Sequence, residues 1–215
     1  MAKLFVLSAP SGTGKSTIAS KLLQQIEGIK KIVTVTTRTP RPGESDGVDY
    51  FFITKEEFEK RIKEEHFLEY AEVYGNYYGT PKDQVERNLK EGVDSLLVID
   101  VQGAFRVKEI FPSAVTVFLL PPSLEELKRR MISRGYRDSN ARLRLETAKK
   151  EIPCAREFDY IIINDFVDKA VYQLKSIITA SRCERESVLE VLKNVLPSEE
   201  IRSLVKGGEC YGKKT

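Results

Sequence analysis

The sequence has few of the residues that mark secreted or zinc-binding proteins. Its 215 residues include only three cysteines, Cys154, Cys183 and Cys210, and no two of them are spaced as C-x-x-C. Neither a zinc site nor a framework of disulfide bonds is therefore indicated. This cysteine usage is typical of a reducing compartment, which favours the cytoplasm.

Long apolar runs and a strong charge of one sign are also missing. No stretch approaches the roughly 20 residues that a membrane-spanning helix requires. Residues 1–20 show no basic segment followed by a long apolar one, so no signal peptide is expected. With 35 basic and 32 acidic residues the formal net charge is +3, too small an excess to indicate nucleic-acid binding by itself. We expect a soluble cytoplasmic protein without a membrane or nucleic-acid partner.

What the chain does contain is an alternation of short apolar runs with longer amphipathic segments. Its length and its 41% of hydrophobic residues suffice for one domain with a full core. Strands alternating with helices predict an α/β fold whose five-stranded parallel sheet is flanked by helices. The predicted strands are residues 4–7, 95–99, 114–120 and 160–163, with a fifth, rich in β-branched residues, at 32–37. The predicted helices are residues 15–27, 81–91, 102–111, 123–134, 142–152 and 166–183.

Two stretches interrupt the alternation. Residues 34–80 combine proline, glycine and aromatic residues with a short helical pattern at 54–65, and they predict a small β-rich insertion outside the main sheet. Residues 134–144 are polar and basic between two predicted helices, a composition typical of a mobile lid. Residues 186–215 form a C-terminal tail, which is expected to be partly helical because apolar residues recur at helical spacing between 188 and 196.

The stretch SAPSGTGKST, residues 8–17, directly follows the first predicted strand. It matches the phosphate-loop pattern G-x-x-x-x-G-K-[ST], with Ala9 in place of the first glycine. Glycines let backbone N–H groups face phosphate oxygens, and the following helix adds its positive N-terminal end. Lys15 is expected to bridge the β- and γ-phosphates, and the hydroxyl of Ser16 to bind Mg²⁺. The predicted nucleotide-contacting residues of this loop are Ala9, Pro10, Ser11, Gly12, Thr13, Gly14, Lys15, Ser16 and Thr17.

A phosphate loop serves kinases, GTPases and motors alike, so other residues must distinguish them. Asp100 ends a buried strand, where it can hold Mg²⁺ through water or contact an acceptor, and with Gly103 it forms the D-x-x-G of a GTPase. A GTPase should also carry N-K-x-D at a late strand end to read guanine. The corresponding strand ends in Asn164 and Asp165 without a lysine between them, which disfavours that class.

The stretch TVTTRTPRPGESDGVDYFF favours a different class. From Thr34 to Tyr50 it resembles the acceptor-binding region of the guanylate kinase family, [ST]-x-x-T-R-x-x-R-x-x-E-x-x-G-x-D-Y. The resemblance continues in FLEYAEVYGNYYGT, IDVQG, LLPPSLEELKRRM, SRG and FDYIIIND, and it covers roughly residues 3–183 in the family's order. The combination of phosphate loop and acceptor region is highly specific to this family, whereas each motif alone is not.

The resemblance implies a role for each matching residue of the acceptor region. Arg38, Arg41, Tyr50 and Tyr78 are expected to hold the phosphate of GMP, and guanidinium groups do bind phosphate dianions bidentately. Glu69, Thr80 and Thr34 are expected to face the guanine, whose N1–H and 2-amino group donate to a carboxylate. Adenine lacks these donors, so such a site rejects it by as much as ~10⁴. Asp100 completes the predicted GMP-binding set.

The resemblance also implies a donor side, where ATP binds the phosphate loop and Asn164 lies near its adenine. Arg130, Arg134 and Arg144 match family positions that gather around the transferring phosphoryl group. Phosphoryl transfer needs positive charge and exclusion of water more than covalent help from the protein. The predicted catalytic residues are Lys15, Arg38, Arg130, Arg134, Arg144 and Asp100, with Mg²⁺ on Ser16 as cofactor.

The family pattern divides the chain into a guanylate-kinase-like domain, residues 1–185, and the tail. Within the domain, the core, the GMP-binding insertion and the lid are expected to close over both nucleotides. Val98 stands where the family usually has a carboxylate, and the lid is one residue shorter than usual. The predicted division is a core of residues 1–33, 81–133 and 145–185, an insertion of 34–80 and a lid of 134–144.

The predicted function is the ATP-dependent phosphorylation of GMP, and of deoxy-GMP, in purine nucleotide metabolism. Two alternatives remain at this stage. A guanylate-kinase-like interaction module would hold a phosphorylated peptide without catalysis, but it has no use for Gly14, Lys15 and Ser16. A kinase for another nucleoside monophosphate is the second, and Glu69 with Thr80 disfavours it. No oligomeric state is predicted.

Overall fold

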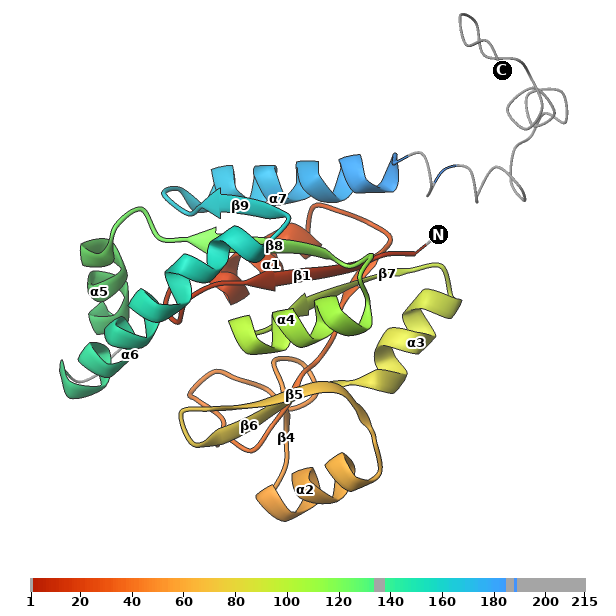
Figure 1. Ribbon diagram of the computed structural model, residues 1–215, viewed down its shortest axis with the longest axis horizontal. Helices are drawn as coiled ribbons and strands as arrows, with labels where there is room; N and C mark the ends of the chain where they lie inside the picture. Colours follow the sequence, from red (N-terminus) through yellow and green to blue (C-terminus); the bar gives the residue numbers. More distant parts are fainter. Residues whose placement is uncertain (1, 134–137, 185–187, 189–215) are drawn as a thin grey trace, which may run out of the picture.

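The computed structural model describes residues 2–133, 138–184 and 188. Five parallel strands form the central sheet in the order β2-β7-β1-β8-β9 (Figure 1). The predicted α/β fold with a parallel five-stranded sheet is therefore confirmed. The strands are β1 (Leu4–Ser8), β2 (Ile29–Lys31), β7 (Asp94–Val98), β8 (Val115–Leu120) and β9 (Tyr160–Ile163).

Helices cover both faces of this sheet because successive side chains of a strand point to opposite sides. On one face, Phe5 and Leu7 of β1 belong to a buried cluster with α1 (Lys15–Leu23) and α7 (Val167–Arg182). On the other face, Leu4 and Val6 pack with α3 (Lys82–Lys90), α4 (Val101–Ile110) and the 3₁₀ helix η1 (Ile152–Glu157). Figure 1 shows α7 and α4 on opposite sides of β1. The carboxyl ends of the strands are thus held between two packed layers.

Two further helices lie at the end of the sheet where the strands finish (Figure 1). α5 (Leu124–Ser133) and α6 (Asp138–Glu151) share a small apolar cluster made by Leu127, Met131 and Ala148. The pair stands beside the loop that follows β1 (Figure 1). Its packing fixes which residues of α6 turn toward that loop.

A second sheet of four strands lies on the α4 side of the central sheet (Figure 1). Its order is β4-β3-β6-β5, with β5 and β3 antiparallel to β6 and β4 parallel to β3. The strands are β3 (Val35–Thr36), β4 (Phe51–Phe52), β5 (Phe67–Val73) and β6 (Asn76–Pro81).

The helix α2 (Lys55–Lys63) covers the second sheet. Its first turn is capped by Thr54, whose hydroxyl accepts from the backbone N–H of Glu57 at 3.2 Å. Phe58 is fully buried and stacks on Phe67 and Tyr77, with ring centroids 4.5 and 5.2 Å apart. The second sheet therefore has its own aromatic core.

The predicted strand at residues 32–37 is wrong as a single element. The structure places Ile29–Lys31 in the central sheet, where Ile32 still donates its N–H to Leu96 at 3.0 Å, and Val35–Thr36 in the second sheet. β-Branched residues favour an extended backbone, but they do not say which strand will pair with it. This run of residues therefore leads from the end of β2 in the central sheet to the start of β3 in the second sheet.

The predicted helices are all present, with two notable shifts in their bounds. α1 ends at Leu23 rather than at residue 27, and the chain then turns through Gly28, with a φ of 73°, before it enters β2 at Ile29. α6 begins at Asp138 rather than at residue 142. Residues 138–144 of the predicted lid are therefore helical.

The lid and the tail fall partly or mainly outside the described residues. Of the predicted lid, residues 138–144 belong to α6, and residues 134–137, with the predicted catalytic Arg134, lie outside. The tail lies outside except for Val188, whose N–H donates to the carbonyl of Glu184 at 3.0 Å. Within residues 2–133, 138–184 and 188, no helix is long and apolar enough to cross a membrane.

Candidate active site

The candidate site is a cavity at the carboxyl ends of β1 and β7, where the strand order changes direction. From β1 the chain crosses to β2 on one side of the sheet, and from β7 it crosses to β8 on the other side of β1. Ligands of open α/β sheets bind where the connections change direction in this way. Leu7 pairs with Val98 in the parallel register, so the loop after β1 emerges beside Asp100. The strand register thus brings together two motifs that are far apart in the sequence.

The loop of residues 8–17 has the backbone conformation that its glycines permit. Gly12 and Gly14 have φ of 89° and 107°, in the left-handed region that favours glycine. Ala9, which replaces the first glycine of the pattern, does not need a positive φ. Lys15 donates its ammonium to the carbonyl of Ala9, which folds the side chain back over the loop.

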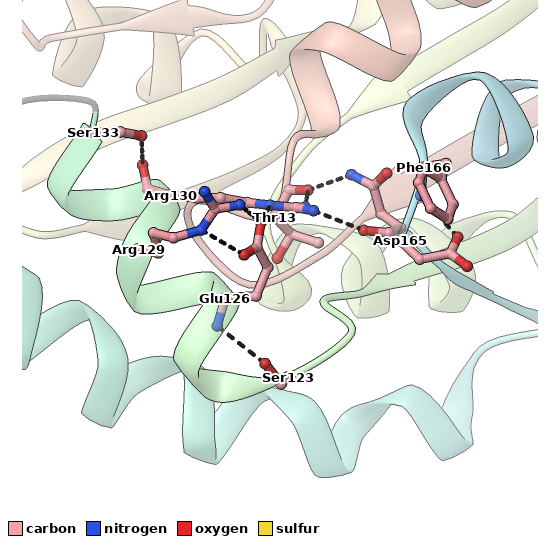
Figure 2. A network of polar contacts seen from close by, with 9 residues as sticks. Thr13, Ser123, Glu126, Arg129, Arg130, Ser133, Asp165 and Phe166 are labelled. Carbon is pink, nitrogen blue, oxygen red and sulfur yellow. Dashed lines mark hydrogen bonds and ion pairs between the residues drawn. The ribbon is translucent and has the colours of Figure 1, made fainter.

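The loop is anchored from behind by a polar network on α5 and after β9 (Figure 2). The carbonyl of Thr13 accepts from Nδ2 of Asn164 at 2.7 Å and from Nη1 of Arg130 at 3.4 Å. Arg130 also donates to the carbonyl of Asn164 at 3.1 Å and to Glu126 at 2.7 Å. A trans peptide points its C=O and N–H in opposite directions, so this anchoring turns the N–H of Gly14 away from the network.

The segment between β3 and β4, together with Tyr78 of β6, contributes a cluster of arginine and tyrosine side chains to the same cavity as the loop. Nη2 of Arg38 donates to both carboxylate oxygens of Glu44, at 2.9 and 2.8 Å, and its guanidinium carbon lies 5.4 Å from the ring centroid of Tyr50. Glu44 also accepts the backbone N–H of Arg41 at 2.8 Å. The rings of Tyr50 and Tyr78 meet edge to face, 6.0 Å apart. Arg38, Arg41, Tyr50 and Tyr78 all line the cavity.

Glu69 lies on β5, whose side chains alternate between the cavity and solvent. Glu69, Ala71 and Val73 line the cavity, whereas Tyr70 and Glu72 are exposed. Glu69 itself is buried, and Thr80 donates its hydroxyl to one carboxylate oxygen. Burial raises the pKa of Glu69 to about 7; the bond from Thr80 opposes this rise and the nearby Asp100 adds to it. The cavity thus holds a carboxylate whose charge changes near neutral pH.

One face of α6 completes the cavity on the side of the phosphate loop. Arg144 and Glu151, seven residues apart, both line it. Nη1 of Arg144 donates to the hydroxyl of Ser11 at 2.7 Å, and its guanidinium carbon lies 4.3 Å from the ring centroid of Tyr74. Burial raises the pKa of Glu151, against the charge of Lys15 and a bond from the backbone of Ser11.

The structure brings most of the predicted site residues into this one cavity. Thr34, Val98 and Asp100 line it too, with Asp100 capping α4 through the N–H of Gly103 at 2.9 Å. Thr80 lies behind Glu69, Arg130 and Asn164 lie behind the loop, and Thr13 belongs to the loop but its carbonyl accepts from both of them. These four and Thr17 are not among the lining residues. The predicted residues that do line the cavity are Ala9, Pro10, Ser11, Gly12, Gly14, Lys15, Ser16, Thr34, Arg38, Arg41, Tyr50, Glu69, Tyr78, Asp100 and Arg144.

Several residues that line the cavity were not predicted from the sequence: Ala71, Val73, Tyr74, Asn76, Ile99 and Glu151. No short sequence pattern around Glu151 or Tyr74 predicts that these residues line the cavity. Gly103 is required because a Cβ there would lie 2.7 Å from a carboxylate oxygen of Glu69. The glycine of IDVQG gave a signal that could have found it, since a glycine early in a helix often marks a close approach.

The donor set of the cavity is suited to Mg²⁺. The hydroxyl of Ser16 and the carboxylate of Asp100 both line it, and such oxygen ligands suit this hard cation. Across the ranges that the structure describes, no group of three or more His, Cys, Asp or Glu side chains could hold a metal. A cation here would need oxygens from a bound phosphate or from water.

A phosphate loop at the switch point of a parallel sheet, facing arginines on an inserted sheet, defines the class of P-loop proteins that bind nucleotides. The comparisons are more specific. The family model described as "Guanylate kinase" matches residues 1–181. The guanylate kinase of Oceanobacillus iheyensis is 48% identical over 194 residues, which are 90% of this chain and 94% of that protein.

The guanylate kinase of Clostridium perfringens is 48% identical over 198 residues, or 92% of this chain and 90% of that protein. A crystal structure of guanylate kinase from Anaplasma phagocytophilum matches with a TM-score of 0.75 at 38% identity, covering 92% of this chain and 97% of that chain. The chain belongs to the guanylate kinase family.

Proposed function

We infer that the chain transfers the γ-phosphoryl group of ATP to GMP, giving ADP and GDP. The observation that supports this most is that one cavity contains both the phosphate loop and the arginine–tyrosine cluster. Two phosphorylated ligands can therefore meet end to end. We propose that ATP binds over residues 9–17 and that GMP lies against the second sheet.

On the acceptor side, we propose that Arg38, Arg41, Tyr50 and Tyr78 hold the phosphate of GMP. Glu44 keeps the guanidinium of Arg38 in place before the ligand arrives. Burial raises the pKa of Tyr50, so its hydroxyl stays protonated and can donate to the phosphate. The base then lies against Glu69, with Thr34 beside it and Thr80 orienting the carboxylate.

On the donor side, the backbone N–H groups of the loop and Lys15 are proposed to hold the β- and γ-phosphates. Arg130 and Asn164 keep the loop in this conformation through Thr13. Arg144 is proposed to stabilise the transferring phosphoryl group, as are Arg130 and Arg134. Mg²⁺, held by Ser16 and by Asp100 through water, would neutralise phosphate charge.

Closure of the site is part of the proposal. Residues 34–80 and 134–144 would close over the core of residues 1–33, 81–133 and 145–185 when both nucleotides bind, excluding water that would otherwise hydrolyse ATP. The proposed reaction needs only small nucleotides as partners, and the cytoplasm is the proposed compartment because ATP and GMP are available there.

The proposal is tested by measuring ADP release from ATP in the presence of GMP, AMP, CMP, UMP or dTMP, one at a time. We expect rapid turnover with GMP and little with the other four. Deoxy-GMP is expected to be accepted, and the same assay checks it. Equal or faster turnover with another monophosphate would contradict the guanine assignment.

Arg41 gives a prediction that separates the two nucleotides. Replacing it with methionine should raise the KM for GMP by about 10- to 100-fold, because a charge-assisted hydrogen bond to phosphate is lost, and change the KM for ATP little. Steady-state kinetics with each substrate varied in turn measure both. Arg87→Met is the matched control, because that exposed arginine pairs with Asp83 on α3, away from the cavity. An equal loss for both substrates would place Arg41 elsewhere.

The raised pKa of Glu69 predicts a pH dependence. The guanine N1–H and 2-amino group donate to the ionised carboxylate, which forms as the pH rises through about 7. We therefore expect kcat/KM for GMP to increase with pH across this range and to decrease below it. In Glu69→Gln only the ionisation of GMP itself should remain in the profile. If both proteins gave the same profile, Glu69 would not be the group that reads guanine.

A further inference from the structure

The hairpin between β5 and β6 places a tyrosine where the backbone disfavours it. Its two turn residues, Tyr74 and Gly75, have φ of 52° and 75°. Turns with two positive φ values strongly prefer asparagine, aspartate or glycine at the first position, and a bulky side chain there is unusual. Asn76 supports the turn by donating its side-chain amide to the carbonyl of Tyr74 at 3.1 Å. Placing an aromatic residue here therefore costs local backbone strain.

The ring of Tyr74 lies at the mouth of the cavity, where it meets Arg144. The guanidinium carbon of Arg144 is 4.3 Å from the ring centroid, within the range of a cation–π contact. The same guanidinium donates to the hydroxyl of Ser11 in the phosphate loop at 2.7 Å. Arg144 therefore contacts both the β5–β6 hairpin and the phosphate loop.

We propose that Tyr74 is a positioning residue for Arg144, which it holds in the orientation that serves phosphoryl transfer. The inference rests on the proposed function, since it takes the transferring group to lie between the loop and the second sheet. An arginine side chain has many rotamers, and ordering it before the reaction removes an entropic cost from the transfer step. A flat ring constrains the plane of a guanidinium while leaving its N–H groups available to the phosphate.

The contact also connects two parts of the molecule. Tyr74 belongs to the second sheet and Arg144 to α6, so the two side chains meet only while these elements are close together. Tyr74 therefore holds Arg144 in place only while the proposed GMP side of the cavity is close to the ATP side. The arrangement links the position of the acceptor sheet to that of a group on the donor side.

The test uses Tyr74→Asn, Tyr74→Leu and Tyr74→Phe, with steady-state kinetics and thermal unfolding for each. Asparagine suits the turn, so it should keep or raise Tm, and leucine leaves the backbone strain as it is. Both should lower kcat about tenfold and change the KM values for ATP and GMP little, because a cation–π contact is lost that orders a group rather than binds substrate. Phenylalanine keeps the ring and should retain the wild-type kcat.

Two further measurements make the test specific. In an Arg144→Ala background, Tyr74→Asn should cause no additional loss, because the residue it orders is already gone. Tyr70→Leu is the matched control: Tyr70 is similarly exposed, on the outward side of β5, with Arg106 at 5.7 Å from its ring centroid, and it does not line the cavity. That variant should turn over like the wild type.

The proposal is overturned if the asparagine and leucine variants keep the wild-type kcat, if phenylalanine loses as much as they do, or if the tenfold loss recurs in the Arg144→Ala background. A failure of the proposed function looks different. In that case the wild-type protein itself would release no ADP with ATP and GMP.

Discussion

Replacing Lys15 with alanine is expected to lower kcat by about a thousandfold or more while the protein remains folded. The ammonium lies over the loop, on the carbonyl of Ala9, and lines the cavity where the β- and γ-phosphates are proposed to bind. Charge builds up on the bridging and terminal oxygens during transfer, and among the residues that the structure describes no other lysine lines this cavity. The loss should therefore fall mainly on kcat.

The control for this variant lies on the same helix. Lys21 pairs with Asp168 at 2.8 Å on the surface, and Lys21→Ala should turn over normally. Urea unfolding of both variants shows whether the fold persists. Normal turnover by a well-folded Lys15→Ala protein would disprove the assignment of residues 8–17 to the donor phosphates.

Replacing Glu69 with glutamine is expected to lower kcat/KM for GMP by roughly a hundredfold or more and to change that for AMP little. A carboxylate accepts two hydrogen bonds from guanine, whereas an amide offers one acceptor and turns a donor toward a donor. AMP has no such donors, so it gains or loses little. The ratio of kcat/KM values for GMP and AMP should thus collapse.

Glu72→Gln is the matched control, because Glu72 lies on the same strand and faces solvent. The ratio of the two kcat/KM values should be unchanged in that variant. An unchanged ratio in Glu69→Gln, with GMP still preferred, would mean that guanine is recognised by other residues. Val98 and Thr34, which also line the cavity, would then be the next to replace.

The phosphate loop and most of the central strands could be predicted because each depends on local sequence, whereas the order of the strands in the sheet was not predicted. Gly12 and Gly14 predict a loop with positive φ, and short apolar runs predict buried strands. The run at residues 32–37 shows the limit of this reasoning. Its β-branched residues specify an extended backbone, but the switch from the central sheet to the second sheet depends on partners that lie far along the chain.

The site residues that escaped prediction are those whose role comes from tertiary contacts alone. Tyr74 is one of them, since nothing near it in the sequence indicates that Arg144 will lie over its ring. Glu151 ends an ordinary charged helix and becomes part of the cavity only because α6 packs on α5. Thr80 was expected to face the base, and only the structure places it behind Glu69. Arg130 and Asn164 similarly support the loop from behind, and their contact with a nucleotide stays a prediction.

The central claim is that one cavity binds two nucleotides with their phosphates facing each other. A crystal structure of the protein with GMP and a non-hydrolysable ATP analogue tests it most directly. We predict the GMP phosphate on Arg38, Arg41, Tyr50 and Tyr78, with the terminal phosphate of the analogue on Lys15 and both within reach of Arg144. GMP bound outside this cavity, or its phosphate turned away from the loop, would contradict the account.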